Sequence, residues 1–342
     1  MTLRPLLVFL IPALVLLQGC ATENNAVFEH EVSSTNRPWT HESFDVADDR
    51  FMFAIFSDLY GGEREGVFAV AMEQLRILRP ELILNVGDLI DGGTEDHQTL
   101  TREWDEFDAR LMGQYAPTFY VGGNHDLTNP VMRNFWEDRY GARYYHFVYK
   151  DVLFLMLDSE DMEEGRMQEV FDARAVHLKV LQEEPARQSE TEYFNMPEYM
   201  TGAVSAEQAS YFREVLRQYP DVRWTFLLMH KPVWRNEDAT EFQSIEAVLV
   251  DRPYTVINGH FHTYSLSERN GRDYIHLGTT SGSQDPADPM AFDHVTLVTM
   301  TDDGPSLVNL RLEGILDKTG HVPLNGDDLC FQASRCNLSP AE

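Results

Sequence analysis

Residues 117–126 read P-T-F-Y-V-G-G-N-H-D, an apolar run that ends in two glycines and then an amide, an imidazole and a carboxylate. Residues 117–121 have the β-branched and aromatic composition of a strand, and the glycines after it permit a sharp backbone turn. Asn124, His125 and Asp126 therefore follow the end of a predicted strand. Because ligands bind at this end of strands in α/β sheets, the stretch predicts an α/β fold with a site beyond residue 121.

Four other predicted strands end in the same way, each followed directly by side chains that can bind a metal or move a proton. Carboxyl ends of strands meet at one edge of an α/β sheet, so all five ends are expected to form one site. Carboxylates, imidazoles and an amide oxygen together suit Mn, Fe, Zn or Co. The four strands are 51–57 before Asp58, 82–86 before G-D-L-I-D at 87–91, 224–229 before His230, and 255–257 before N-G-H-F-H at 258–262.

Helical segments separate the strands up to about residue 270. Residues 67–78 carry apolar side chains at helical spacing, residues 101–112 indicate another helix, and a capping box at Ser205 begins a third. Beyond residue 270 three successive strands suggest a second sheet. The order predicts an α/β domain in which sheets pack together. These late strands are expected at 274–277, 294–300 and 306–312.

The charge balance excludes one broad class of partner. The chain has 56 acidic and 27 basic residues, a formal net charge of −29. Such a surface repels nucleic acid and anionic lipid headgroups, so nucleic-acid binding is not expected. A hydrophobic content of 43% is that of an ordinary globular protein.

The N-terminus resembles the signal peptide of bacterial lipoproteins. Arg4 gives a positive start, residues 6–17 are apolar but too few to span a bilayer, and L-Q-G-C at 17–20 resembles a lipobox. Residues 1–19 would be removed, Cys20 would carry lipid, and residues 20–48 would form a tether. A plain secretory signal is the alternative. The lipoprotein interpretation predicts a bacterial cell-envelope protein, lipid-anchored on a membrane and facing the periplasm or the cell surface.

Residues 49–315 are expected to form the main domain and residues 316–342 a C-terminal tail. Cys330 and Cys336 are the cysteines that remain once Cys20 is lipidated. In an oxidising cell envelope this pair is expected to form a disulfide, since two cysteines alone do not make a structural zinc site.

The segment 159–203 interrupts the alternation of strands and helices and is rich in acidic residues. Val170, Phe171, Leu178 and Leu181 could form one helical face within it. The segment is either a surface excursion packed on the domain or a lid or partner surface near the site. We favour the surface excursion.

Taken in order, the strand-end blocks resemble those of the calcineurin-like metallophosphoesterase superfamily: D-x-H, G-D-x-x-D, G-N-H-D/E, a lone His after a strand, and G-H-x-H. Four of the five are present over about residues 51–265. The resemblance implies two packed mixed β-sheets flanked by helices. It also implies metal-dependent hydrolysis of a phosphomonoester or phosphodiester, with no particular small phosphoester indicated.

Carried over by position, the resemblance implies two metal ions, divalent or of mixed valence, drawn from Mn, Fe, Zn and Co. Asp88 would bridge both ions, and His125 would act as general acid at the leaving group with Asp126 orienting its ring. Asp91 is not expected to be a ligand. The implied ligands are Asp88, Asn124, His230 and His260 for one ion, and Asp58, Asp88 and His262 for the other.

Tyr60 departs from this pattern, because the superfamily has a histidine ligand two residues after the aspartate. A tyrosine binds metal well only after losing its proton, and its ordinary pKa is about 10. Tyr60 is therefore a phenolate ligand, or it points away and leaves a weaker three-ligand site, or it marks a protein that has lost activity. The last case corresponds to a binding or scaffolding lipoprotein on a degenerate fold. Retention of His125 favours an enzyme, because a pure binder has no use for a leaving-group acid.

Overall fold

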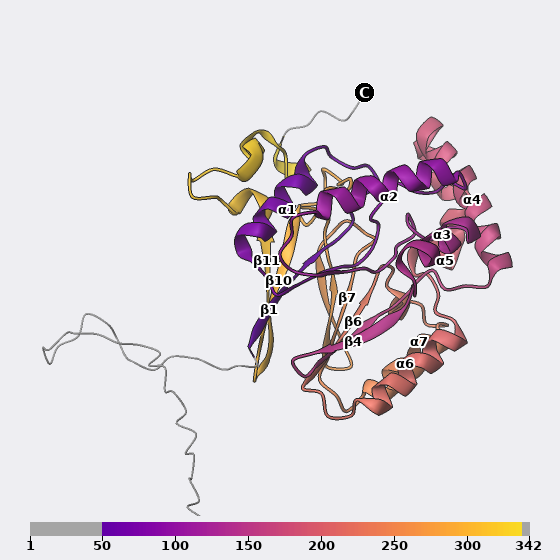
Figure 1. Ribbon diagram of the computed structural model, residues 1–342. Coiled ribbons are helices and arrows are strands. Elements are labelled where there is room, and N and C mark those ends of the chain that lie inside the picture. Colours follow the sequence, from indigo (N-terminus) through magenta and orange to yellow (C-terminus); the bar gives the residue numbers. More distant parts are fainter. Residues whose placement is uncertain (1–49, 337–342) are drawn as a thin grey trace, which may run out of the picture. The chain divides into compact units, whose positions relative to one another are not determined.

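Two mixed β-sheets form the centre of the computed structural model, which describes residues 50–336 (Figure 1). The predicted signal peptide and tether lie outside the described residues. The first sheet has the order β11 (Gly304–Arg311), β10 (His294–Thr301), β1 (Phe51–Phe56), β2 (Leu82–Asn85) and β3 (Thr118–Phe119). The second has the order β4 (Tyr145–Tyr149), β5 (Val152–Met156), β6 (Trp224–Met229), β7 (Tyr254–Asn258), β9 (Arg272–His276) and β8 (Ser265–Arg269).

The alternation of side chains along β1 shows how the layers are built. Phe53 and Ile55 pack with Phe154 and Phe226 of the second sheet, in a core between the two sheets. Ala54 and Phe56, at the alternate positions, point the other way, and Phe56 packs against Phe68 of a helix on the outer face. Because strand side chains alternate between faces, one apolar strand supplies both cores.

Helices cover the outer faces of both sheets. Helices α1 (Val67–Leu78) and α2 (His97–Leu111) share a core with the first sheet, and α3 (Pro130–Tyr140) joins them through buried Trp136. Helices α6 (Ala206–Gln218) and α7 (Thr240–Leu249) lie side by side over the second sheet (Figure 1). No helix among residues 50–336 is long and apolar enough to cross a membrane. The predicted α/β architecture of two packed mixed sheets flanked by helices is confirmed.

The late strands do not form a sheet of their own, and that prediction is wrong. Strand β10 pairs antiparallel with β1, so residues 294–301 and 304–311 complete the first sheet. Strand β9 instead pairs parallel with β7 in the second sheet. The apolar edges of β1 and β7 accept these strands because backbone N–H and C=O groups at a buried edge need partners.

The C-terminal region packs on the domain more closely than the word tail implies. Val322 and Phe331 are buried in the core that α1 shares with the first sheet. The expected disulfide between Cys330 and Cys336 is present, with Cα atoms 5.9 Å apart. The Arg64 side chain donates to the Cys330 carbonyl and ties this region to the loop after β1.

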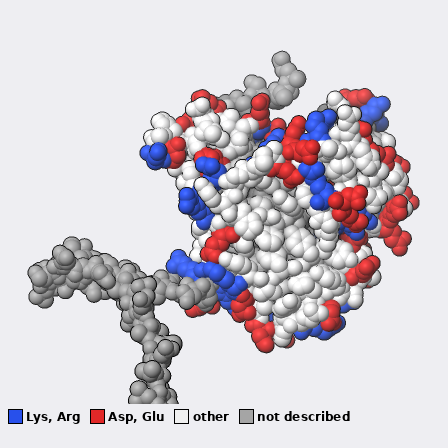
Figure 2. All heavy atoms as spheres, viewed as in Figure 1, with Lys and Arg blue, Asp and Glu red and all other residues white. Residues whose placement is uncertain are grey.

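The segment 159–203 contains α4 (Glu164–Glu183) and the short α5 (Pro197–Met200). Acidic side chains gather over α4 at the right of the view in Figure 2. The predicted apolar face is wrong, because Leu178 and Leu181 are 43% and 40% exposed. The buried face of α4 instead consists of Met167, Val170, Ala173, Arg174 and His177.

Buried His276, at the end of β9, makes the fold sensitive to acid. Its ring stacks on Phe261, and neither ring nitrogen has a hydrogen-bond partner among the described residues. Burial, helped by Arg235, lowers the pKa of His276 from 6.5 to about 3. As the pH decreases, His276 is protonated in the unfolded chain before it is protonated in the folded protein. The contribution of neutral His276 to the free energy of unfolding is therefore fully present above pH 6.5 and is lost as the pH decreases toward 3.

We therefore expect His276→Phe to reduce the acid sensitivity of folding. The variant keeps a ring against Phe261 but has no proton to gain, so its free energy of unfolding should fall less steeply below pH 6.5. The difference in slope should approach about 1.4 kcal/mol per pH unit. Urea unfolding at pH 7 and pH 5 measures it. The control is His321→Gln, which replaces an exposed histidine, and equal slopes for His276→Phe and wild type would contradict the prediction.

Candidate metal centre

The backbone turns abruptly at four of the predicted ligands. Asp58, Asp88, His260 and His262 have φ angles of 46°, 58°, 81° and 56°, in the left-handed region that non-glycine residues rarely adopt. Asp58 and Asp88 lie just beyond β1 and β2, and the two histidines lie just beyond β7. Such strained conformations concentrate at functional sites, where they aim side chains that a regular strand would direct elsewhere.

Three of the predicted ligands form one compact group. Ligand atoms of Asp58, Asp88 and His262 all lie within 4.8 Å of one another. His262 Nε2 is 3.4 Å from Asp58 Oδ1, and the same carboxylate oxygen accepts from the backbone N–H of His260 at 3.0 Å. Among residues 50–336, no other group of three or more His, Cys, Asp or Glu side chains meets this ligand geometry.

The other three predicted ligands join this group through Asp88. His230 Nε2 lies 3.2 Å from Asp88 Oδ2 and 3.1 Å from Asn124 Oδ1. The ring of His260 lies beside His230, with centroids 5.1 Å apart. The structure thus brings all six predicted ligands together, with Asp88 between the two halves of the set.

Backbone carbonyls fix the orientation of the three histidines. His230 Nδ1 donates to the Val86 carbonyl at 2.9 Å, and His262 Nδ1 donates to that of Ser283 at 2.7 Å. His260 Nε2 donates to the Tyr199 carbonyl at 2.8 Å. A carbonyl can only accept, so this bond uses one ring nitrogen of each histidine and leaves the second for another partner. Metal-binding histidines in proteins are held in this way.

The electrostatics of the site favour a cation. Although burial opposes the charge, His230 holds the pKa of the Asp88 carboxyl well below its usual range. Burial likewise opposes charge on His230, but Asp88 raises the pKa of that imidazole to about 9. The protonated ring therefore takes the place beside Asp88 that a metal ion could take. The donor set of carboxylates, imidazoles and an amide oxygen fits a hard or borderline divalent ion, and metal binding would release this proton.

His125 lies at the rim of the same site. Its backbone N–H donates to Asp88 Oδ1, and its ring Nδ1 donates to the Asp91 carbonyl at 2.7 Å. The expected role of Asp126 in orienting this ring is not what the structure shows. Both Asp126 carboxylate oxygens accept from backbone N–H groups, those of Leu89, Ile90 and Gly123, so Asp126 shapes the loops around the site. Burial raises the pKa of the Asp126 carboxyl to about 8.

Comparison with known proteins decides the family. A sequence model of the calcineurin-like phosphoesterases matches residues 51–264, which is more than half of the chain. The chain belongs to this family. The calcineurin-like phosphoesterases are phosphoric ester hydrolases, and the buried cluster of Asp58, Asp88 and His262 is the candidate metal site of this member.

Solved structures show the same fold at low sequence identity. A dimetal phosphatase from Danio rerio is 16% identical with a TM-score of 0.50, over 76% of this chain and 98% of that one. GAP50, described as the anchor in the inner membrane complex of Plasmodium, is 14% identical with a TM-score of 0.50, over 80% of this chain and 87% of that one. No curated protein matches the chain in sequence.

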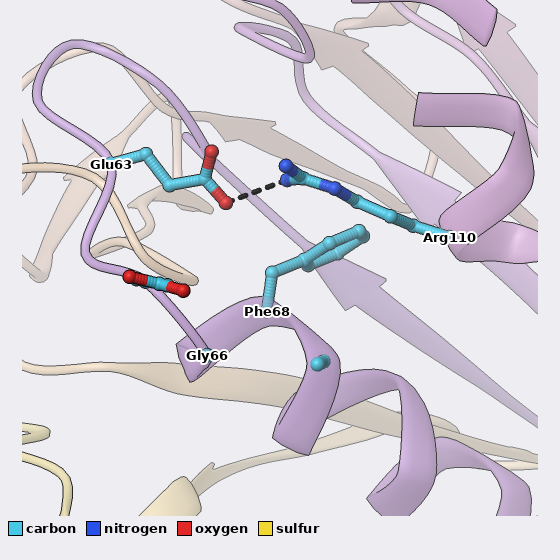
Figure 3. Close-up of a pocket in the computed structure, with 6 residues that line it drawn as sticks. Glu63, Gly66, Phe68 and Arg110 are labelled. Atoms are coloured by element: carbon cyan, nitrogen blue, oxygen red, sulfur yellow. Dashed lines mark hydrogen bonds and ion pairs between the residues drawn. The ribbon is translucent and has the colours of Figure 1, made fainter. Parts of the chain in front are cut away.

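The Tyr60 side chain points away from the metal ligands. Its ring packs against the core under α1 and is 5.8 Å from the guanidinium of Arg110. Burial, with Glu63 adding to it, raises the pKa of the phenol far above its ordinary value, which opposes a phenolate. Glu63 and Arg110 pair at 2.6 Å, and both line a pocket of about 240 Å³ (Figure 3). Of the three interpretations of Tyr60, this placement corresponds to the side chain that points away.

Gly61, not Tyr60, approaches the centre. A Cβ atom at Gly61 would lie 3.1 Å from His262 Cε1 and 3.6 Å from His125 Nε2, and its φ of +78° disfavours any side chain. The loop after β1 thus passes beside the site with its backbone, where the D-x-H pattern of the family would supply an imidazole. This leaves Asp58, Asp88 and His262 as the candidate ligands on this side of the site.

We therefore expect Tyr60→Phe to leave metal binding intact. The metal content and kcat/KM should stay within about twofold of wild type, while loss of the phenol's interaction with Glu63 should cost about 1 kcal/mol of stability. Elemental analysis, kinetics and urea unfolding test these points. Asp58→Asn serves as the comparison that should lower the metal content. A fall in metal content in Tyr60→Phe would show that the phenol is a ligand.

Sequence reasoning missed three residues that touch the predicted ones. Tyr199 and Ser283 act through their carbonyls, which carry no sequence signature. Arg174 Nη2 lies 3.2 Å from His125 Nε2. The arginine could have been found, because it recurs at helical spacing with Met167 and Val170 on the buried face of α4. The segment 159–203 therefore packs on the domain and also contacts the site through Tyr199 and Arg174.

Proposed function

We propose that this protein hydrolyses a phosphomonoester or phosphodiester at a two-metal centre. One observation carries the proposal: backbone carbonyls fix the rings of His230, His260 and His262, and the second ring nitrogens of His230 and His262 face the buried carboxylates of Asp88 and Asp58. A core that needed only stability would not gather ionised carboxylates and oriented imidazoles at strained backbone positions.

Six residues would hold the ions, with Asp88 shared between them. Asp58 and His262 would complete the first site, and Asn124, His230 and His260 the second. When bound, such ions supply Lewis-acid charge that polarises the phosphoryl group and activates water. Mn, Fe, Zn and Co all suit these donors.

His125 is the candidate for the proton donor to the leaving group. Its Nδ1 is held by the Asp91 carbonyl, so Nε2 is the nitrogen that would take up a proton from solvent and then deliver it to the departing oxygen. Proton delivery of this kind spares the leaving alkoxide its charge. The Nε2 atom lies on the side of Gly61 that also faces His262, which supports a proton donor beside the candidate ligands.

A cleft of about 340 Å³ offers a place for the organic part of the substrate. It is lined by His260 and His262, by Phe261 between them, and by Tyr199 and Met200 of the segment 159–203. The mixture of apolar side chains with two candidate ligands suits an ester whose phosphoryl group reaches the centre.

The decisive experiment combines metal analysis with turnover. Purified protein would be assayed with a chromogenic phosphomonoester and diester after reconstitution with Mn, Fe, Zn or Co. We expect one to two ions per chain and metal-dependent hydrolysis of at least one substrate. A metal content well under one ion per chain, together with no turnover under any metal, would favour the binding or scaffolding alternative that the departure at Tyr60 suggests.

We also propose that the protein acts in the bacterial cell envelope, anchored through lipid on Cys20. The support is the resemblance of residues 1–20 to a lipoprotein signal peptide. Metabolic labelling with a fatty-acid analogue tests the anchor. A mature protein without incorporated label would favour the plain secretory signal.

A further inference from the structure

A buried guanidinium without a carboxylate partner lies beside the centre. Arg174, on α4, is only 5% exposed. Its one hydrogen bond to a side chain within residues 50–336 runs from Nη2 to His125 Nε2 at 3.2 Å, and no carboxylate of this part of the chain pairs with it. Because His125 Nδ1 donates to Asp91, Nε2 accepts this bond, and the other N–H groups of the guanidinium remain available.

Two other cations near the site, one buried and one half-buried, are neutralised by carboxylates. Lys231 is fully buried, but its ammonium lies 2.9 Å from Glu160 and also donates to the Glu198 carbonyl. Arg64 pairs with Asp293 at 2.6 Å. A buried charge is costly unless something pairs with it, so the lack of a carboxylate at Arg174 calls for another anion.

We propose that Arg174 binds a non-bridging oxygen of the substrate's phosphoryl group and so makes α4 part of the active site. The inference rests on the proposed phosphoesterase function. On binding, the guanidinium exchanges its contact with His125 for the phosphoryl oxygen, which frees Nε2 to take up a proton from solvent and face the leaving group. The planar fork of arginine matches the geometry of phosphate oxygens better than an ammonium does.

The segment that carries Arg174 is built to hold it in place. Arg166 of α4 forms two hydrogen bonds of 2.9 Å with the Glu198 carboxylate, which joins the helix to α5. Glu198 is joined in turn to the domain through its carbonyl and Lys231. Gly93 leaves room for the guanidinium, since a Cβ atom there would lie 2.9 Å from Arg174 Nη1. In a chain of net charge −29, a fixed arginine offsets the repulsion of an anionic substrate.

The test compares Arg174→Gln with Lys179→Gln, which removes an exposed charge from the same helix. In metal-loaded protein, Arg174→Gln should weaken the binding of inorganic phosphate, measured by calorimetry, by about 10- to 100-fold. It should lower kcat/KM by a similar factor, while the metal content stays at the wild-type value. Arg174→Lys should have a phosphate affinity and kcat/KM between those of wild type and Arg174→Gln, because lysine keeps the charge but lacks the planar fork of arginine. Lys179→Gln should match wild type in every measurement.

The outcomes separate this inference from the proposed function. If wild type turns over substrate but Arg174→Gln matches it in phosphate affinity and kcat/KM, Arg174 is structural and the inference alone fails. If wild type neither hydrolyses esters nor binds phosphate, both fail. Phosphate binding that depends on Arg174 in a protein without turnover would retain the anion site and overturn only the hydrolase. If Arg174→Gln does not fold, the phosphate affinity of Arg174→Lys decides, and a value equal to wild type would contradict the fork geometry.

Discussion

Asp88→Asn is expected to abolish metal-dependent hydrolysis, with a loss of about 10³-fold or more in kcat/KM. Metal ions supply several kcal/mol of charge stabilisation, and each 1.4 kcal/mol corresponds to a tenfold change in rate. Asp88 is the one predicted ligand shared by both ions. Its Oδ2 faces His230, and the carboxylate also lies within 4.8 Å of the ligand atoms of Asp58 and His262, so both halves of the site depend on this side chain. The metal content should fall below that of wild type.

The asparagine variant is nearly isosteric, which separates the loss of charge from the loss of shape. Its amide can still accept the N–H of His125, so the loop after β2 should keep its conformation. Circular dichroism and elemental analysis of the purified variant provide the measurements. Asp251→Asn, at an exposed position after α7, is the control and should retain metal and activity. Wild-type metal content in Asp88→Asn would show that this carboxylate does not join the two sites.

Much of the metal centre could be predicted from the sequence because its residues follow strands in short blocks. The strand at 224–229 and the helix at 67–78 were predicted at their observed bounds, since periodic apolar residues define both. Ser205 caps α6 as its capping box indicates, accepting from the Gln208 N–H. Local patterns of this kind are sufficient to place Asp58 and Asp88 beyond neighbouring parallel strands.

What could not be predicted depends on contacts between distant segments. The pairing of β10 with β1 joins residues far apart in the sequence, and no local pattern specifies which edge a strand chooses. The buried face of α4 escaped prediction because Arg174 and His177 lie on it, whereas Leu178 and Leu181, which a hydrophobic pattern would bury, are exposed. Buried polar residues interrupt the apolar pattern from which a buried helical face is predicted, and such interruptions are expected at functional sites.

His125→Asn is the second change with a large expected effect, and the effect should depend on the leaving group. The leaving group of an alkyl ester is a strongly basic alkoxide that needs a proton, so kcat for this ester should fall by about 10²- to 10⁴-fold. The leaving group of a nitrophenyl ester is a stable anion, so kcat for this ester should fall far less. The structure supports this division because the ring is held through Nδ1 by the Asp91 carbonyl and is not among the groups that gather around Asp58 and Asp88.

The metal content distinguishes this role from a structural one. Because His125 is not an expected ligand, His125→Asn should bind as much metal as wild type while losing its activity on alkyl esters. His97→Asn, at the exposed start of α2, is the matched histidine control and should behave as wild type on both esters. Equal losses on the alkyl and nitrophenyl esters would assign His125 to binding or positioning. A parallel loss of metal would place its ring among the ligands, and either result would remove the general acid from the proposed mechanism.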